Sequence, residues 1–182
     1  MKKWKRIEPT VVSKIGYRSV ISKTFQLPNG KVYHFDTDNA EHSRGAAVLA
    51  LTPENEVITC RMFRAGSEMI MDEIPGGGVD EGEDLEVGAR RELLEETGYE
   101  PGAMQYLGVM HYSSSDNMAR HCFLATNCTP SEKGTNWDEH EFIEVRLITI
   151  DELIANAKAG KMTDPGAVLL AYEELQNRRG KK

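Results

Sequence analysis

The residues best suited to chemistry in this sequence are three glutamates, Glu92, Glu95 and Glu96, in a segment with helical character from Asp84 to Thr97. At 100° per residue they fall within one arc of about 100°, which they share with small residues one turn earlier. Like charges three and four residues apart repel, and they repel more strongly when desolvated. Carboxylate oxygens are also the ligands that Mg²⁺ and Mn²⁺ prefer. The pattern therefore indicates either a solvated acidic face or a divalent-cation site.

The charge of the chain is concentrated around this helix. The 182 residues carry a net charge of −7, and the stretch from Gly76 to Glu100 contains nine acidic residues and only two basic ones. Binding to a nucleic-acid backbone requires clustered Lys and Arg, so we expect no nucleic-acid partner.

The composition is that of an ordinary globular protein, with 40% hydrophobic and 28% charged residues. No apolar run approaches the roughly 18 residues that span a bilayer, so we expect no membrane partner. The basic N-terminus has no apolar stretch typical of a secretory signal. Three cysteines cannot form an even disulfide framework, which favours a reducing, cytoplasmic location.

Strands and helices are predicted in an order that indicates a mixed α/β or α+β fold. Residues 1–40 are predicted to form an N-terminal β-hairpin segment, and residues 41–182 the main domain. A two-stranded hairpin is marginal alone, so it must pack on the main body or on another subunit. The predicted strands are Ser19 to Leu27, Lys31 to Asp36, Gly45 to Thr52, Glu56 to Arg64, Gln105 to Tyr112, Arg120 to Asn127 and Glu141 to Ile150. Two C-terminal helices are expected, over Asp151 to Ala159 and from a cap at Asp164-Pro165 to about Arg178.

The segment GGVDEGEDLEVGARRELLEETGY resembles the signature of the Nudix hydrolases. Seven fixed residue types and one apolar position of that signature are matched, and Tyr99 stands where the family usually has an aliphatic residue. The seven are Gly77, Glu83, Arg91, Glu92, Glu95, Glu96 and Gly98.

The resemblance implies an α/β/α sandwich with a mixed sheet and a site that binds two or three Mg²⁺ ions, with Mn²⁺ as a substitute. It implies that Glu92, Glu95 and Glu96 are metal ligands, together with the backbone carbonyl of Gly76. Glu83 and Arg91 are implied to form the pair that orients them. The implied reaction is metal-assisted attack of water on a pyrophosphate bond.

In the branch of the family that hydrolyses ADP-ribose, the carboxylate that accepts the water's proton comes from a loop after the signature. Glu141 is the favoured base or distal metal ligand here and Glu139 is next, the alternative being an exposed acidic loop. The histidines, including His140, show no metal-binding spacing.

The resemblance to that branch covers nearly the whole chain, including the motifs LPNGK and DEIPGGGVDEGE. It implies that Arg64, with Arg61, contacts the substrate, unless Arg64 is simply an edge-strand residue. Glu73 is either a substrate contact or the partner of Arg64, and Tyr112 is either a base-stacking residue or a core or edge tyrosine.

We therefore expect hydrolysis of ADP-ribose or a related nucleoside diphosphate sugar to a nucleoside monophosphate and a sugar phosphate, by a homodimer. The proline that ADP-ribose-specific members carry about 15 residues after the signature is absent. The alternatives are a Nudix enzyme for nucleoside triphosphates or dinucleoside polyphosphates, and a nucleotide-sugar sensor without turnover.

Overall fold

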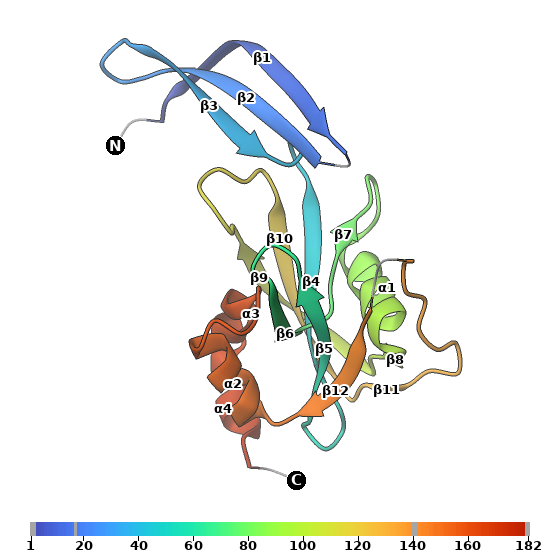
Figure 1. The fold of residues 1–182 in the computed structure, drawn as a ribbon. Helices are drawn as coiled ribbons and strands as arrows, with labels where there is room; N and C mark the ends of the chain where they lie inside the picture. Colours follow the sequence, from blue (N-terminus) through green and yellow to red (C-terminus); the bar gives the residue numbers. More distant parts are fainter. Residues whose placement is uncertain (1–2, 17, 140–141, 181–182) are drawn as a thin grey trace. The chain divides into compact units, whose positions relative to one another are not determined.

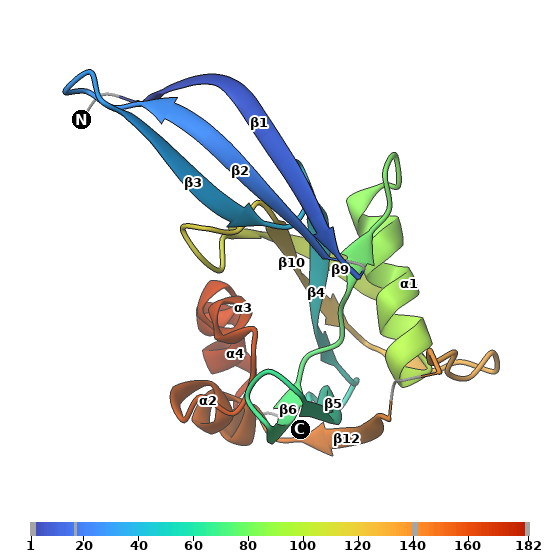
Figure 2. The same cartoon turned by 45° about the horizontal axis from the view of Figure 1, so that its top comes forward.

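A computed structural model of the chain describes residues 3–16, 18–139 and 142–180 (Figures 1 and 2). The chain divides into two compact units: unit 1 comprises Met1–Arg44 and His111–Ala119, and unit 2 comprises Gly45–Met110 and Arg120–Lys182. Among the described residues, none of the helices has the length and apolar character needed to cross a bilayer.

Unit 1 is built on a three-stranded antiparallel sheet in the order β1-β2-β3. Its strands are β1 (Lys5–Ile15), β2 (Arg18–Gln26) and β3 (Val32–Asp38). The predicted hairpin is present as β2 and β3, but β1 was not predicted. A register shift between Ile7 and Val11 interrupts the two-residue alternation by which strands are recognised. On one side of this sheet the rings of Trp4, Phe25 and Phe35 pack together.

Unit 2 contains a seven-stranded mixed sheet with the strand order β12-β5-β4-β10-β9, in which β6 pairs with β5 and β7 with β4. Two short strands, β8 and β11, pair separately. The strands are β4 (Arg44–Leu51), β5 (Val57–Arg64), β6 (Met69–Glu73), β7 (Gly78–Val79), β8 (Tyr99–Glu100), β9 (Ala103–Met110), β10 (Ala119–Thr126), β11 (Thr129–Pro130) and β12 (Glu144–Ile148).

Helices cover both faces of this sheet, as the two views show (Figures 1 and 2). One face carries α1, and the other carries α2, α3 and α4. The helices are α1 (Leu85–Thr97), α2 (Ile150–Lys158), α3 (Pro165–Leu170) and α4 (Tyr172–Arg178). This confirms the predicted α/β/α sandwich.

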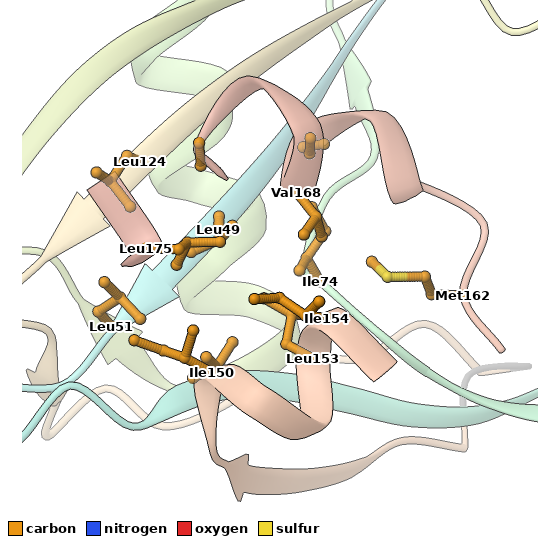
Figure 3. Close-up of a cluster of buried hydrophobic side chains, with 14 of the residues drawn as sticks. Leu49, Leu51, Ile74, Leu124, Ile150, Leu153, Ile154, Met162, Val168 and Leu175 are labelled. Atoms are coloured by element: carbon orange, nitrogen blue, oxygen red, sulfur yellow. The ribbon is translucent and has the colours of Figure 1, made fainter. Parts of the chain in front are cut away.

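The alternation of side chains along β4 explains the two layers. Ala47, Leu49 and Leu51 pack in a cluster with α2, α3 and α4 (Figure 3). The intervening residues Ala46 and Val48 pack in a second cluster that includes Ala89 and Leu93 of α1. Because β4 is buried on both faces, its sequence is a continuous apolar run.

Helix α1 begins and ends where the sequence predicts. The Asp84 carboxylate caps it by accepting hydrogen bonds from the backbone N–H groups of Glu86 and Val87. Gly98 ends it in the left-handed conformation, with φ 74°.

Two predicted boundaries at the C-terminal end were wrong. The final helix is divided into α3 and α4 at Ala171, and Asp164 makes no side-chain cap to α3. The last strand begins at Glu144 rather than Glu141, which lies outside the described residues.

Candidate active site

The glycine loop before β7 and the C-terminal half of α1 lie against each other. The backbone N–H of Gly76 donates a 2.7 Å hydrogen bond to Oε2 of Glu96. Cys60 Sγ of β5 lies 3.8 Å from the same oxygen. Glu96 is buried, at 8% exposure, although carboxylates are rarely buried without partners. The helix therefore directs this glutamate inward, toward the loop and the sheet.

The absence of a side chain at Gly77 creates the place that Glu92 occupies. A Cβ built on Gly77 would lie only 2.4 Å from Glu92 Oε2 and 2.6 Å from its Cδ. Gly76 is equally constrained, because a Cβ there would lie 2.2 Å from the backbone oxygen of Ala46 in β4. The two glycines thus allow the loop to fit between β4 and the carboxylate of Glu92.

Arg91 links the acidic side chains to one another. Its guanidinium donates to Glu83 at 3.1 Å, to Glu92 at 2.8 Å and to Glu95 at 3.0 Å. It also donates to the carbonyl of Gly78 at 2.8 Å. Hydrogen bonding to Glu83 is the main cause that raises the pKa of Arg91. Burial raises the pKa of Glu92, and Arg91 opposes that shift.

The residue types at this site are suited to binding a divalent metal ion. Three helix carboxylates and loop carbonyls are hard oxygen donors, and the carboxylates around Arg91 outnumber its single positive charge. Within the described part of the chain, no group of three acidic, histidine or cysteine side chains forms a ready-made metal cluster. Glu92 and Glu95 contact Arg91, and Glu96 contacts the Gly76 N–H. Their role as ligands therefore stays a prediction.

The predicted substrate residues on β5 and β6 lie in two different settings. Arg64 Nε donates at 2.7 Å to Oε2 of Glu73, a carboxylate only 1% exposed. Of the two predicted alternatives for Glu73, its pairing with Arg64 is therefore observed. Nη1 of Arg61 lies 3.7 Å from Oδ2 of Asp72. Because neighbouring side chains of a strand point to opposite faces of the sheet, Arg61 faces away from Glu96, which Cys60 contacts.

The sequence also predicts functional roles for Tyr112, Glu139 and Glu141. Tyr112 is exposed and belongs to unit 1. Glu139 lies in an exposed turn, and Glu141 and His140 lie outside the described residues. The roles predicted for Tyr112, Glu139 and Glu141 stay predictions.

Two residues that contact this region, Trp137 and Arg120, were not predicted from the sequence. Trp137 Nε1 donates at 2.9 Å to the backbone carbonyl of Glu96, which ties the loop after β11 to the end of α1. Arg120 of β10 donates at 3.1 Å to the carbonyl of Gly77 and at 3.1 Å to Asp164. Neither residue belongs to a recognisable motif, and the only available signal was the placement of Arg120 in a strand whose later residues, Cys122 to Ala125, are apolar and buried.

Comparison with known proteins identifies the family of this chain. The model of the NUDIX domain family matches residues 41–169, and the chain therefore belongs to that family. It is 33% identical over 154 residues to an ADP-ribose pyrophosphatase of Bacillus subtilis, covering 83% of this chain and 82% of the relative. It is 32% identical over 171 residues to a methanol dehydrogenase activator of Bacillus methanolicus, covering 85% of this chain and 91% of the relative.

The fold is also that of a solved structure. The crystal structure of an ADP compounds hydrolase matches with a TM-score of 0.80 at 18% identity, covering all of this chain and 98% of that one. At this identity the likeness shows the shared fold.

Proposed function

We propose that this chain is a pyrophosphohydrolase that uses a divalent metal to cleave ADP-ribose or a related nucleoside diphosphate sugar into a nucleoside monophosphate and a sugar phosphate. The observation that carries the proposal is the convergence of Glu92 and Glu96 on the loop Gly76-Gly77. The similarity to the ADP-ribose pyrophosphatase of Bacillus subtilis over most of both chains supports the substrate class.

The proposed metal ligands are Glu92, Glu95 and Glu96, with the Gly76 carbonyl and Glu141. Bound Mg²⁺ or Mn²⁺, with two or three ions per site, would neutralise the diphosphate and activate water for attack on phosphorus. The role of the protein's own residues is to hold the carboxylates in place. Arg91 does this through its bonds to Glu83, Glu92 and Glu95.

The residues proposed to act on the substrate lie outside the helix. Glu141, or else Glu139, is proposed to accept the proton of the attacking water, because both follow the signature in an acidic loop, where the ADP-ribose-hydrolysing branch of the family carries this carboxylate. The partly exposed guanidinium of Arg64, held by Glu73, is suited to contact an anionic or polyol portion of the substrate. Arg61 and Tyr112 are the remaining proposed contacts.

A second candidate function is activation of a dehydrogenase. The near full-length similarity to the methanol dehydrogenase activator favours it. The two functions are compatible, because an activator can act through hydrolysis of a nucleotide. Addition of the chain, or of the variant Glu96→Gln, to a methanol dehydrogenase would separate them. Stimulation by the wild type alone would link activation to the glutamate site, and no stimulation by either would exclude it.

We also propose that the protein is a cytoplasmic homodimer. Unit 1 exposes large apolar side chains that a partner subunit would cover, among them Val11, Val12 and Ile15. The three free, buried cysteines fit a reducing compartment. Light scattering at micromolar concentration tests the assembly, and a monomer would refute it.

The catalytic proposal is tested by screening ADP-ribose, other nucleoside diphosphate sugars, nucleoside triphosphates and dinucleoside polyphosphates with Mg²⁺. We expect a nucleoside monophosphate and a sugar phosphate from the ADP-ribose class, with no product from Glu96→Gln or in the presence of a chelator. Turnover of triphosphates alone would indicate the second nucleotide class. Binding without turnover of any candidate would indicate a sensor and overturn the proposal.

A further inference from the structure

A buried ion pair, between Arg120 and Asp164, contacts the glycine loop. The side chain of Arg120 in β10 is 12% exposed, and its partner Asp164, at the start of α3, is 2% exposed. One end of the guanidinium donates to Asp164 Oδ2 and the other to the carbonyl oxygen of Gly77, each at 3.1 Å. Arg120 therefore joins the loop to an element from the opposite face of the sheet.

Residues at the start of β4 pack closely around the contact between Arg120 and Gly77. A Cβ at Gly45 would lie 3.0 Å from Nη1 of Arg120 and 3.1 Å from the Gly77 oxygen, so only a glycine lets the two meet without displacement. The same oxygen of Gly77 accepts a 2.9 Å hydrogen bond from the backbone N–H of Ala46. The carbonyl of Gly77 is thus fixed from two directions.

The loop that Arg120 holds is the loop against which two of the helix glutamates rest. Glu92 occupies the space beside the Cα of Gly77, and Glu96 accepts from the N–H of Gly76. A shift of the Gly77 peptide would therefore move the surface that sets the position of Glu92, and with it the Gly76 N–H. Arg91 also holds Glu92, through a 2.8 Å hydrogen bond to its carboxylate.

We propose that Arg120 is a positioning residue for the divalent-metal site. With Asp164 as its anchor, it holds the Gly76-Gly77 loop so that Glu92 and Glu96 keep the spacing a bound ion requires, and it touches neither the ion nor the substrate. This inference rests on the proposed function, because it assigns a role within that same site. The planar guanidinium of Arg120 is needed for this role because its two ends donate to Gly77 and to Asp164, whereas a lysine offers a single ammonium group.

The test uses variants that disturb the contact in two ways. Arg120→Gln with Asp164→Asn removes both charges together, which avoids leaving a lone buried carboxylate. Gly45→Ala keeps both charges and pushes a methyl group against the contact. Arg120→Lys keeps the charge and loses the fork. The matched control is Arg178→Gln in α4, because Arg178 also bridges two partners, Glu174 and Asn55, and makes no contact with the loop.

Three quantities are measured on the purified full chain: Mn²⁺ affinity without substrate, by electron paramagnetic resonance; kcat and KM with ADP-ribose; and the thermal unfolding midpoint. We expect the double variant to bind Mn²⁺ about tenfold or more weakly, in the range found for residues that orient metal ligands. We expect kcat to fall more than KM rises, Arg120→Lys to recover only part of the loss, and the control to match the wild type.

The proposal is overturned if the folded double variant binds Mn²⁺ and turns over within twofold of the wild type. If the double variant does not fold, Gly45→Ala decides by the same two measurements, and unchanged values there overturn the proposal. A wild type that neither binds Mn²⁺ nor hydrolyses any nucleotide would instead refute the proposed function itself.

Discussion

Replacing Gly77 with alanine should disable the site while leaving the fold intact. The new Cβ would lie 2.4 Å from Oε2 of Glu92, about 1 Å closer than ordinary contact, so the carboxylate must retreat by about that amount. Gly77 does not have a positive φ, so alanine suits its backbone. Displacement of a reacting group by 1 Å costs on the order of 100-fold in rate. We therefore expect kcat to fall about 100-fold and Mn²⁺ affinity about tenfold or more.

The stability of the Gly77→Ala variant should change by no more than about 1 kcal/mol. The atom displaced is the end of a flexible side chain, and the ion pair between Glu92 and the partly exposed Arg91 contributes about 0 to 1 kcal/mol. Loss of that pair is offset by about 0.4 to 1 kcal/mol, because alanine restricts the unfolded chain more than glycine does. Urea unfolding measures this difference, alongside metal titration and steady-state kinetics.

Gly78→Ala is the matched control for this experiment. A Cβ at Gly78 meets nothing within 4 Å, so rate, metal affinity and stability should all stay close to those of the wild type. If Gly77→Ala retained its rate and Mn²⁺ affinity within threefold, the position of Glu92 beside the glycine loop would not matter to catalysis, and the reasoning would be wrong. Global unfolding of the variant would contradict the stability argument.

Three further predictions follow from the same contacts. Glu96→Gln should lose metal-dependent turnover. Its free energy of unfolding should change by less than about 1 kcal/mol, because the glutamine side chain can still accept a hydrogen bond from the Gly76 N–H. Near-normal turnover would exclude Glu96 as a metal ligand. Gly76→Ala should lower the free energy of unfolding, measured by urea denaturation, by about 1 to 3 kcal/mol, because its Cβ would lie 2.2 Å from the backbone oxygen of Ala46. An unchanged free energy of unfolding would mean that the loop moves freely. Burial raises the pKa of Asp164 to about 7 from 3.8. The folded chain then binds the proton more tightly, so the contribution of Asp164 to stability is present at pH 4 and is lost as the pH rises toward 7, by at most about 4 kcal/mol, with Arg64 opposing the shift. Unfolding curves from pH 4.5 to 8 that are identical for wild type and Asp164→Asn would contradict this.

Much of this fold could be predicted because local patterns decide it. The apolar run of β4 indicates a strand buried on both faces, and Asp84 and Gly98 mark the two ends of α1. β1 could not be predicted because a register shift disrupts its alternation. No local helix breaker marks the division of the last helix at Ala171, and only its first half, α3, packs against both α2 and β9.

The site could be predicted where its residues follow one another at helical spacing. Glu92, Glu95 and Glu96 share an arc of α1, and Arg91 reaches Glu95 one turn away, as expected from a spacing of four residues. The contacts of Arg120 and Trp137 could not be predicted, because each joins residues about 40 positions apart and depends on how the sheet brings β10 and the loop after β11 to the glycine loop and α1.

The central claim, that the glutamates of α1 hold a divalent metal against a diphosphate, is tested most directly by Mn²⁺ uptake. Electron paramagnetic resonance of the purified chain, with and without ADP-ribose, counts the bound ions. The account predicts saturable uptake by the wild type that is strengthened by the nucleotide and greatly reduced in a variant with both Glu92→Gln and Glu96→Gln. Absence of uptake by the wild type under both conditions, or equal uptake by the double variant, would contradict it.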